Sequence, residues 1–526
     1  MIQNNGYLHD AFIGLARSLR WSYLPPLMVY LAAGISGLTA IVGTFFVKDY
    51  LGLSAAFLAG LGFWAGLPWA LKMPLGHLVD LFWRHKNYFV YLGALVITAS
   101  LLIMFGLIAH TENMRAVMSV EAWYVVSVIL APVGYVLQDV VADAMTVEAV
   151  PTTDPTGEPL PASEIKEMHT TMQALGRFAV IGGSLLVALL NVALFSDVET
   201  LSDDAKRSVY ASIYLYALAI PCVSIAGVIL ARYLRHTRSV NELAGARIRP
   251  NWAVLTGSLV FVVFSVSVGS FDIPFAQEIV FLGSMAIIVY LMGQLLGYLS
   301  SEKRLMVVGT AVAIFVFRAI PSPGPGLTWF EIDVLLFDEQ FLSVLAAISS
   351  ALTLLGIVLL RPLVAYYSIA RIIVVLSLVG GLLFLPSIGM YYGLHQWTAS
   401  LTAGFIDARF IAILNTALES PLGQISMIPL LAWIAKNAPD ELKATFFAVF
   451  ASFTNLALSA SSLATKYINQ VFEVSRQIVD PVTRQVTTQA DYSELGLLLI
   501  AVAIITIIVP ISVVAVVQRS PLRSTD

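Results

Sequence analysis

The sequence predicts an all-α polytopic membrane protein with about fourteen transmembrane helices. Of its 526 residues, 58% are hydrophobic and only 12% are charged, and the mean hydropathy is +0.85. Soluble domains carry about 25% charged residues, so the core of a soluble protein does not account for this composition. Runs of about 20 apolar residues recur from residue 25 onward, and each is long enough to cross about 30 Å of hydrocarbon as a helix.

The apolar runs form groups of six, two and six. The expected spans are 25–47, 53–79, 88–109, 122–149, 166–195 and 209–232; then 252–271 and 276–299; then 305–320, 341–360, 368–393, 403–435, 442–467 and 494–518. If the N-terminus is cytoplasmic, most Lys and Arg residues between the spans fall on the cytoplasmic side. This excess predicts that both termini lie in the cytoplasm. The membrane is expected to be a bacterial inner (plasma) membrane. Residues 10–21 are expected to form an amphipathic helix at the membrane surface.

The most basic loop, around 232–250, divides the chain between the sixth and seventh spans. Six spans before it and six at the end predict two parallel six-helix bundles of the major facilitator type, with an inserted two-helix hairpin. The expected domains are an N-terminal segment (1–24), the first bundle (25–232), linker and hairpin (233–304), the second bundle (305–518) and a cytoplasmic tail (519–526).

Charged side chains inside apolar spans are the best guide to function. A charge at the centre of a bilayer costs roughly 2.5–3.5 kcal/mol on insertion scales, so such residues usually face a partner or a watery cavity. Here they fall on a few spans only: Lys72, Asp139, Asp143, Arg177, Arg318, Asp407 and Arg409. In the facilitator architecture, the first, second, fourth and fifth spans of each half line the central cavity, and these charges map to such spans.

Asp139 and Asp143 share one helix face because they are four residues apart, and Gln138 borders them. Two carboxylates so close together favour binding of a proton unless a cation intervenes, and Lys72 and Arg177 are the candidate cations. The group is either a proton- or substrate-binding cluster or an ion-pair network that locks adjacent helices.

In the second half, Asp407 and Arg409 point to different helix faces near an outer end, so they are either solvated or functional. Arg318 also lies at an outer end, where it can snorkel. Glu419 is deeper, just before a Pro421–Gly423 interruption of the helix. Broken helices at the membrane midplane often frame binding sites, and the alternative is an ordinary kink.

A glycine, an acid and two bases follow the second span: Gly76, Asp80, Arg84 and Lys86. This loop predicts a charge latch on the cytoplasmic face that breaks and re-forms as the two halves rock. No phosphate-binding loop, His-Glu-x-x-His helix or Gly-x-Ser-x-Gly elbow is present, so the sequence indicates gradient-driven transport by a protein that is not an enzyme and needs no cofactor. The net charge of −4 gives no case for nucleic-acid binding, and the lone Cys222 excludes an internal disulfide.

Several segments resemble the folate-biopterin transporter family, a branch of the major facilitator superfamily: LPWALKMPLG at 67–76, QDVVADAM at 138–145, GQISMIPLL at 423–431 and ATFFAVFASFTNL at 444–456. The resemblance implies proton-linked movement of a folate or pteridine. Residue by residue, it marks Lys72, Gln138, Asp139 and Asp143, and also Gln424. Muropeptide permeases form a related branch, and they commonly carry two extra helices.

The favoured hypothesis is therefore a monomeric proton-coupled symporter or exchanger that works by alternating access. Its partners are a small-molecule substrate, protons and the lipid bilayer. One alternative keeps the transporter but changes its cargo to a muropeptide-like or other amphoteric solute. The other alternative is a non-transporting membrane scaffold, in which the intramembrane charges serve packing alone.

Overall fold

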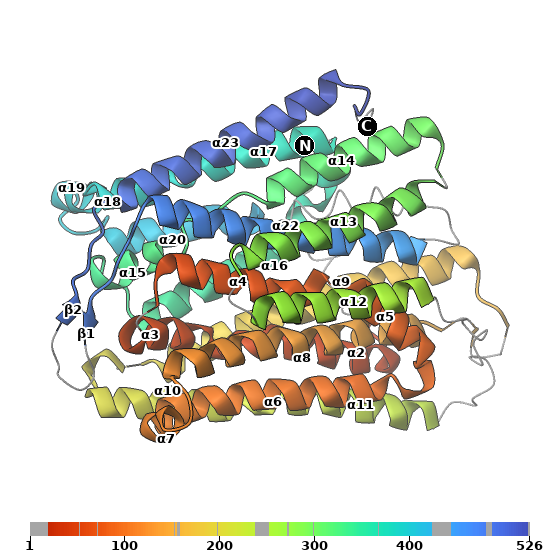
Figure 1. The fold of residues 1–526 in the computed structure, drawn as a ribbon, viewed down its shortest axis with the longest axis horizontal. Helices are drawn as coiled ribbons and strands as arrows, with labels where there is room; N and C mark the ends of the chain where they lie inside the picture. Colours follow the sequence, from red (N-terminus) through yellow and green to blue (C-terminus); the bar gives the residue numbers. More distant parts are fainter. Residues whose placement is uncertain are drawn as a thin grey trace. The chain divides into compact units, whose positions relative to one another are not determined.

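A computed structural model describes residues 19–51, 53–70, 72–151, 153–154, 158–196, 198–236, 252–270, 273–297, 299–366, 368–422, 443–479 and 486–523. Long helices make up nearly all of this part of the chain, which confirms the predicted all-α membrane fold (Figure 1). The chain separates into two compact units. The first contains Met1–Gly43 and Pro74–Thr256, and the second contains Thr44–Met73 and Gly257–Asp526.

The first unit is built from helices of the first half of the chain. They are η1 (Trp21–Tyr23), α2 (Leu24–Ile35), η2 (Ser36–Thr39), α5 (Lys72–Leu81), η3 (Trp83–His85), α6 (Asn87–Ala109), α7 (Thr111–Arg115), α8 (Val120–Ala149), α9 (Ala162–Leu194), η4 (Val198–Thr200), α10 (Asp203–Ala217) and α11 (Ala219–His236). Helix α3 (Ala40–Tyr50) starts in this unit and continues into the second, and the first two residues of α5, Lys72 and Met73, belong to the second unit.

The second unit holds α4 and nearly all elements after residue 252. They are α4 (Ala55–Ala70), α12 (Trp252–Ser270), α13 (Ala276–Leu296), α14 (Ser301–Arg318), α15 (Pro325–Asp333), α16 (Glu339–Tyr366), α17 (Ile369–Leu382), α18 (Leu385–Tyr391), α19 (Leu394–Leu401), α20 (Ala408–Glu419), η5 (Ser420–Leu422), α22 (Lys443–Val471), β1 (Ile478–Val479), β2 (Val486–Thr488) and α23 (Leu495–Arg519). The two short strands pair antiparallel between α22 and α23.

Among the described residues, nine helical stretches are long and apolar enough to cross a membrane. They are Trp21–Lys48, Asn87–Ala109, Val120–Ala149, Thr171–Thr200, Asp203–Leu234, Ala276–Gln294, Glu339–Ile357, Ile369–Tyr391 and Leu495–Arg519. Ala55–Trp69 is apolar but shorter. Large apolar side chains such as Leu95 and Leu186 are exposed on these helices, as expected for surfaces that face lipid. The chain is thus an integral multi-pass membrane protein, and the count of about fourteen spans stays a prediction.

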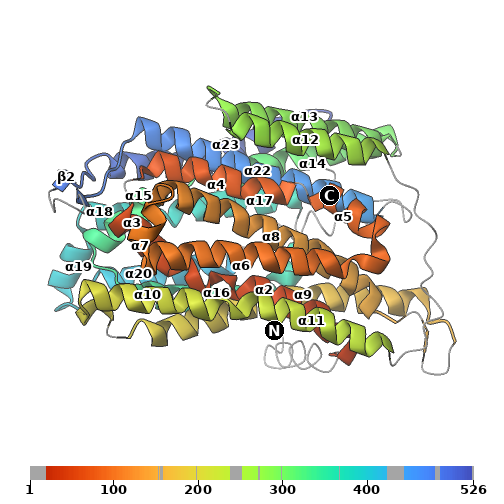
Figure 2. The same ribbon diagram turned by 60° about the horizontal axis from the view of Figure 1, so that its bottom comes forward.

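In the first unit, α2 packs against α8, α9 and α11, and α6 and α8 run side by side (Figures 1 and 2). Glycines make the closest approaches possible. A Cβ added to Gly34 of α2 would lie 2.1 Å from the carbonyl oxygen of Val180 in α9, and one added to Gly183 would lie 2.9 Å from the carbonyl oxygen of Leu31. Small residues that allow backbone contact are the usual means of packing helices in membranes.

In the second unit, α4 packs along α22, and α23 packs along α17 (Figure 1). Gly62 and Gly66 of α4 face Ser462 and Ser459 of α22, again a close approach between small residues. The inserted hairpin, α12 and α13, contacts this pair: Phe63 and Leu67 of α4 share a buried cluster with residues of α12, α13 and α22. The hairpin is therefore packed into the second unit.

Some elements differ from the sequence prediction. Span one was predicted as an unbroken helix over 25–47, but η2 interrupts it, because Ser36 and Gly37 are both poor helix formers. The interruption predicted in the span at 403–435 is confirmed as far as the structure describes it, since α20 ends at Glu419 and η5 follows. The predicted bundle boundaries at 232 and 305 stay predictions, and the surface helix at 10–21 lies outside the described residues except for its end.

Candidate functional site

Tyr30 is the centre of a polar cluster inside the first unit. Its hydroxyl, on α2, donates a 2.5 Å hydrogen bond to Oδ1 of Asp143 on α8, and the tyrosine side chain is buried. The charges of Asp143, Asp139 and Arg177 all act on this hydroxyl. Three of the residues singled out from the sequence, two acids on α8 and one base on α9, are therefore brought to one place.

Helix geometry explains this grouping. Asp139 and Asp143 lie one turn apart in α8, which is helical from Val120 to Ala149, so both reach the same side of that helix. On α9, Gly176 precedes Arg177 and leaves room for the tyrosine ring: a Cβ at Gly176 would lie 2.9 Å from Cε2 of Tyr30. The close contact of α2 with α9 therefore sets where the Tyr30 hydroxyl sits.

Sequence reasoning missed Tyr30, because a tyrosine in an apolar span is most often a packing residue. A second difference concerns Gln138, which is buried but contacts other helices. Its Nε2 donates to the carbonyl oxygen of Val90 on α6 at 3.3 Å, and its Oε1 accepts a bond from Ser224 of α11 at 2.8 Å. Through these two bonds, Gln138 links α8 to α6 and α11.

The predicted latch loop contains one strong contact. Lys86 is only 1% exposed, and its ammonium group pairs with Glu148 at the end of α8. It also lies 4.0 Å from the centre of the Trp83 ring. The latch residue is thus tied to the helix that carries Asp139 and Asp143. Gly76 and Asp80 lie in α5 and Arg84 lies in η3, and an added Cβ at Gly76 would meet no atom within 4 Å.

The other predicted residues lie in the second unit. Lys72 is the partly exposed first residue of α5, and Arg318 is the partly buried last residue of α14. Asp407 caps α20 by accepting a 2.8 Å bond from the backbone N–H of Phe410. Arg409 pairs with Asp338 at 3.0 Å and also donates to the carbonyl oxygen of Leu336.

Glu419 is the last residue of α20, where the helix gives way to η5. That turn packs tightly on α16, because a Cβ at Gly356 would lie 2.7 Å from Cα of Pro421. Thr353 of α16 also donates to the carbonyl oxygen of Ser420 at 3.1 Å. Gln424 lies outside the described residues.

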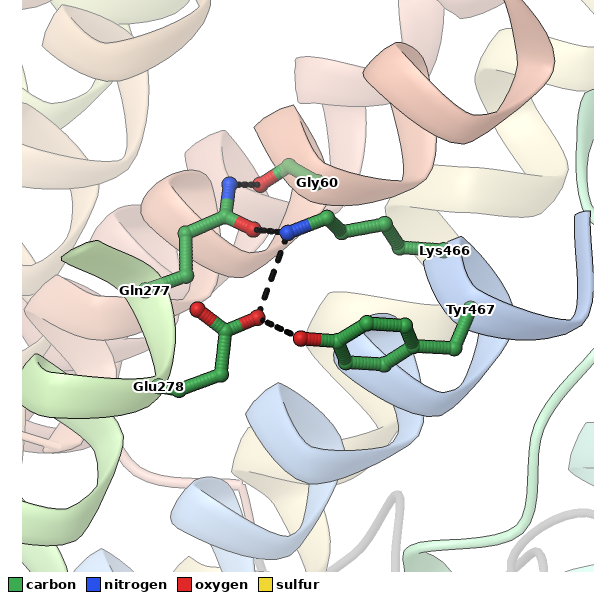
Figure 3. A network of polar contacts seen from close by, with 5 residues as sticks. All are labelled: Gly60, Gln277, Glu278, Lys466 and Tyr467. Atoms are coloured by element: carbon green, nitrogen blue, oxygen red, sulfur yellow. Dashed lines mark hydrogen bonds and ion pairs between the residues drawn. The ribbon is translucent and has the colours of Figure 1, made fainter. Parts of the chain in front are cut away.

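The second unit contains a polar clasp that the sequence did not reveal, made of Gln277, Glu278, Lys466 and Tyr467 (Figure 3). Nζ of Lys466 on α22 lies 2.9 Å from Oε1 of Gln277 and 3.2 Å from Oε1 of Glu278, both on α13. The Tyr467 hydroxyl also donates to Glu278, and Nε2 of Gln277 donates to the carbonyl oxygen of Gly60 at 3.0 Å. The clasp therefore joins α4, α22 and the inserted hairpin.

A third ion pair described in this unit lies at the end of span one. Nζ of Lys48 on α3 lies 2.6 Å from Oδ1 of Asp333 at the end of α15, and the Tyr492 hydroxyl donates to Oδ2 of Asp333 at 2.5 Å. Nearby in the sequence, burial raises the pKa of the Glu331 carboxyl on α15 to about 7. Within the described residues, no three His, Cys, Asp or Glu side chains are grouped as a metal would need.

Comparisons with known proteins agree with this architecture. The family model described as the BT1 family matches residues 33–525. A curated protein from Synechocystis sp. named "Folate-biopterin transporter" is 22% identical over 449 residues, which cover 84% of this chain and 74% of that protein.

Solved transporter structures share the fold. A POT family transporter in complex with 5-aminolevulinic acid superposes with a TM-score of 0.62 at 13% identity, covering 96% of each chain. A bacterial homologue of the human drug peptide transporters PepT1 and PepT2 gives 0.58 at 15% identity, covering 95% of this chain and 98% of that one. At such identities the likeness shows the fold alone, and it bears out the facilitator-type architecture expected from the sequence.

Proposed function

The chain belongs to the BT1 family of membrane transporters, and from this premise we propose that it moves a folate- or pteridine-type solute by alternating access, coupled to protons. The name of the Synechocystis relative supports the cargo. The hydrogen bond from Tyr30 to Asp143, with Asp139 and Arg177 close enough to act on it, is the observation that carries the coupling.

The cluster has the chemistry that proton coupling requires. Ionised Asp143 accepts a charge-assisted bond from Tyr30, and such bonds are worth about 1.5–3 kcal/mol. A proton that neutralises this carboxylate weakens the bond to Tyr30 and changes the balance of charge around that hydroxyl, on which Asp139 and Arg177 also act. Because these residues lie on α2, α8 and α9, a change of charge here alters how these helices hold together.

The same groups suit a pteridine. The ring edge presents N–H and amino donors, which a carboxylate accepts in two parallel hydrogen bonds. A folate tail adds carboxylates that a basic side chain can bind. In this proposal Asp139 or Asp143 binds the pteridine ring, and Arg177 or Lys72 binds the tail. We extend the substrate and proton path on the second half to Arg318, Asp407, Arg409, Glu419 and Gln424.

The proposal also includes a cytoplasmic latch and the orientation of the protein in its membrane. The Lys86–Glu148 pair supports a cytoplasmic latch, in which Gly76, Asp80 and Arg84 also take part. The excess of Lys and Arg in the inner segments supports cytoplasmic termini, with the protein working as a monomer in a bacterial inner membrane.

The cargo is tested by thermal stabilisation of the purified protein in detergent. A ligand that binds only the folded state raises the melting temperature, by an amount that grows with ligand concentration. We expect folates and pterins to raise it in a saturable manner, and anhydro-muropeptides to leave it unchanged. Stabilisation by muropeptides alone would transfer the proposal to that cargo.

The coupling is tested with Asp143→Asn and Tyr30→Phe in vesicles that carry a pH gradient. We expect Asp143→Asn to abolish uptake driven by the gradient while the protein still reaches the membrane, and Tyr30→Phe to reduce it. Asp204→Asn, at the exposed start of α10, is the matched control and should transport like the parent. Normal proton-driven uptake by Asp143→Asn would leave the cluster a packing role only.

A further inference from the structure

Span one is broken in the middle by a short 3-10 turn. Helix α2 ends at Ile35, η2 occupies Ser36–Thr39, and α3 resumes at Ala40, although the whole stretch Trp21–Lys48 is apolar enough to cross a membrane. A stretch of 3-10 helix inside a longer helix often marks a hinge. Inside a membrane, it persists only when neighbouring groups bind the backbone atoms that it frees.

Helix α9 supplies two such groups. Nδ2 of Asn191, whose side chain is 1% exposed, donates to the carbonyl oxygen of Leu38 at 3.3 Å. The Ser184 hydroxyl lies 3.3 Å from the carbonyl oxygen of Gly34 and also 3.3 Å from that of Val180 in its own helix, so it shares its proton between the two. Within the turn region, Ser36 bonds back to the carbonyl oxygen of Ala33 at 2.7 Å. The break is thus held by specific donors on both sides.

Two tyrosines from other helices complete the contacts. The side chain of Ser36 acts on the hydroxyl of Tyr135 on α8, and the side chain of Thr39 acts on the hydroxyl of Tyr214 on α10. Side chains from α8, α9 and α10 therefore surround η2, and all of them belong to the first unit. We call Tyr135, Ser184, Asn191 and Tyr214 the cage.

The two sides of the break are held by different parts of the molecule. Tyr30, on α2, bonds to Asp143 in the first unit. The first unit ends at Gly43, and Lys48, at the far end of α3, pairs with Asp333 in the second unit. The segment 36–39 therefore lies shortly before Gly43, where the chain passes from the first unit to the second.

We propose that Ser36–Thr39 is a hinge that couples the Tyr30–Asp143 site to the Lys48–Asp333 pair. This inference rests on the proposed transport by alternating access. It places part of the conformational change of that transport cycle at residues 36–39. Hinges are short segments that absorb a change of backbone angles between parts that move as bodies. The cage keeps the turn formed in one state, and its bonds exchange as α2 and α3 change their relative direction.

The test uses two glycines that accept a Cβ without any clash. An added Cβ at Gly37, in the hinge, would meet no atom within 4 Å, and the same holds at Gly182 on α9. Alanine at either position favours regular helix over glycine by roughly fivefold. Gly37→Ala should therefore bias the turn toward continuous helix, while Gly182→Ala adds the same preference to a segment that is already helical.

The readout is the distribution of distances between spin labels at Val117→Cys in the first unit and Val334→Cys in the second, in a Cys222→Ser background. Both labelled positions are exposed. We expect Gly37→Ala to narrow the distribution to one population and to slow uptake at least threefold, with Gly182→Ala matching the parent. Asn191→Leu, which removes the donor to Leu38, should act in the same direction as Gly37→Ala.

The outcomes separate the hinge from the transport proposal. Distances that are the same in Gly37→Ala, Asn191→Leu and Gly182→Ala, in a protein that still takes up folate, overturn the hinge alone. Distances that respond to Gly37→Ala in a protein that no folate or pterin stabilises support the hinge and overturn the cargo. The label measurement needs no ligand, so it remains decisive in either case.

Discussion

Replacing Lys466 by methionine tests whether the polar clasp holds the inserted hairpin. The ammonium group lies 3.2 Å from Oε1 of Glu278 and 2.9 Å from Oε1 of Gln277. At 3.2 Å, the Coulomb attraction is about 5 kcal/mol for an effective dielectric constant of about 20. Desolvation of both charges offsets most of this attraction. Methionine keeps an apolar stem of similar length and removes the positive charge together with its hydrogen-bond donors.

The free energy of unfolding that Lys466→Met loses is smaller than the Coulomb attraction between the two charges. The two side chains are 21% and 22% exposed, so neither charge is fully withdrawn from solvent. Hydrogen bonds between membrane helices measure about 0.6 kcal/mol on average and about 1.7 kcal/mol at most. With two bonds removed, Lys466→Met should lower the free energy of unfolding by about 1–2 kcal/mol.

The assay is reversible unfolding in mixed detergent micelles, with a double-mutant cycle. Glu278→Gln alone and with Lys466→Met gives the coupling energy of the pair, which we expect to be close to 1 kcal/mol. Arg115→Met is the control, because its pair with Glu112 is 39% and 83% exposed and should contribute less than about 0.5 kcal/mol. A zero coupling energy, or an equal loss in Arg115→Met, would refute the reasoning.

Two further changes test buried carboxylates. Lys86→Met should lower the free energy of unfolding by about 3–5 kcal/mol, because it leaves Glu148 without its buried cationic partner; full rescue on adding Glu148→Gln checks this, and a loss under 1 kcal/mol contradicts it. For Glu331, burial raises the pKa to about 7 in the folded state, so the folded protein holds the proton more tightly. The tighter proton binding of Glu331 stabilises the folded state fully below about pH 4.5, and this contribution to the free energy of unfolding is lost as the pH rises through about 7. Thermal unfolding of Glu331→Gln should lose that slope, while Glu302→Gln, at the exposed start of α14, should keep it.

The sequence carries the information that is local. Apolar runs predict the membrane helices, and the four-residue spacing of Asp139 and Asp143 places both on one side of α8, where the structure has them. The Pro421 interruption was also predictable, because proline cannot continue a helix without losing a hydrogen bond.

Contacts between distant residues were out of reach. Lys86 and Glu148 are 62 positions apart, and Lys466 and Glu278 are 188 positions apart. Nothing in either local sequence indicates its partner, since each is an ordinary charge near a helix end. Tyr30 was missed for a related reason: its bond to Asp143 depends on how closely α2 meets α8 and α9, which the chain settles only when it folds.

The contact of α2 with α9 limits how this protein can diverge. Main-chain atoms of the two helices touch at Gly34 and Gly183, so no side chain separates them. Glycine is already the smallest residue, so every replacement at these positions wedges the helices apart and shifts the Tyr30 hydroxyl. Mutation at these two positions can therefore only increase the separation of α2 and α9, and any change that brings the groups around Tyr30 closer together has to come from other side chains.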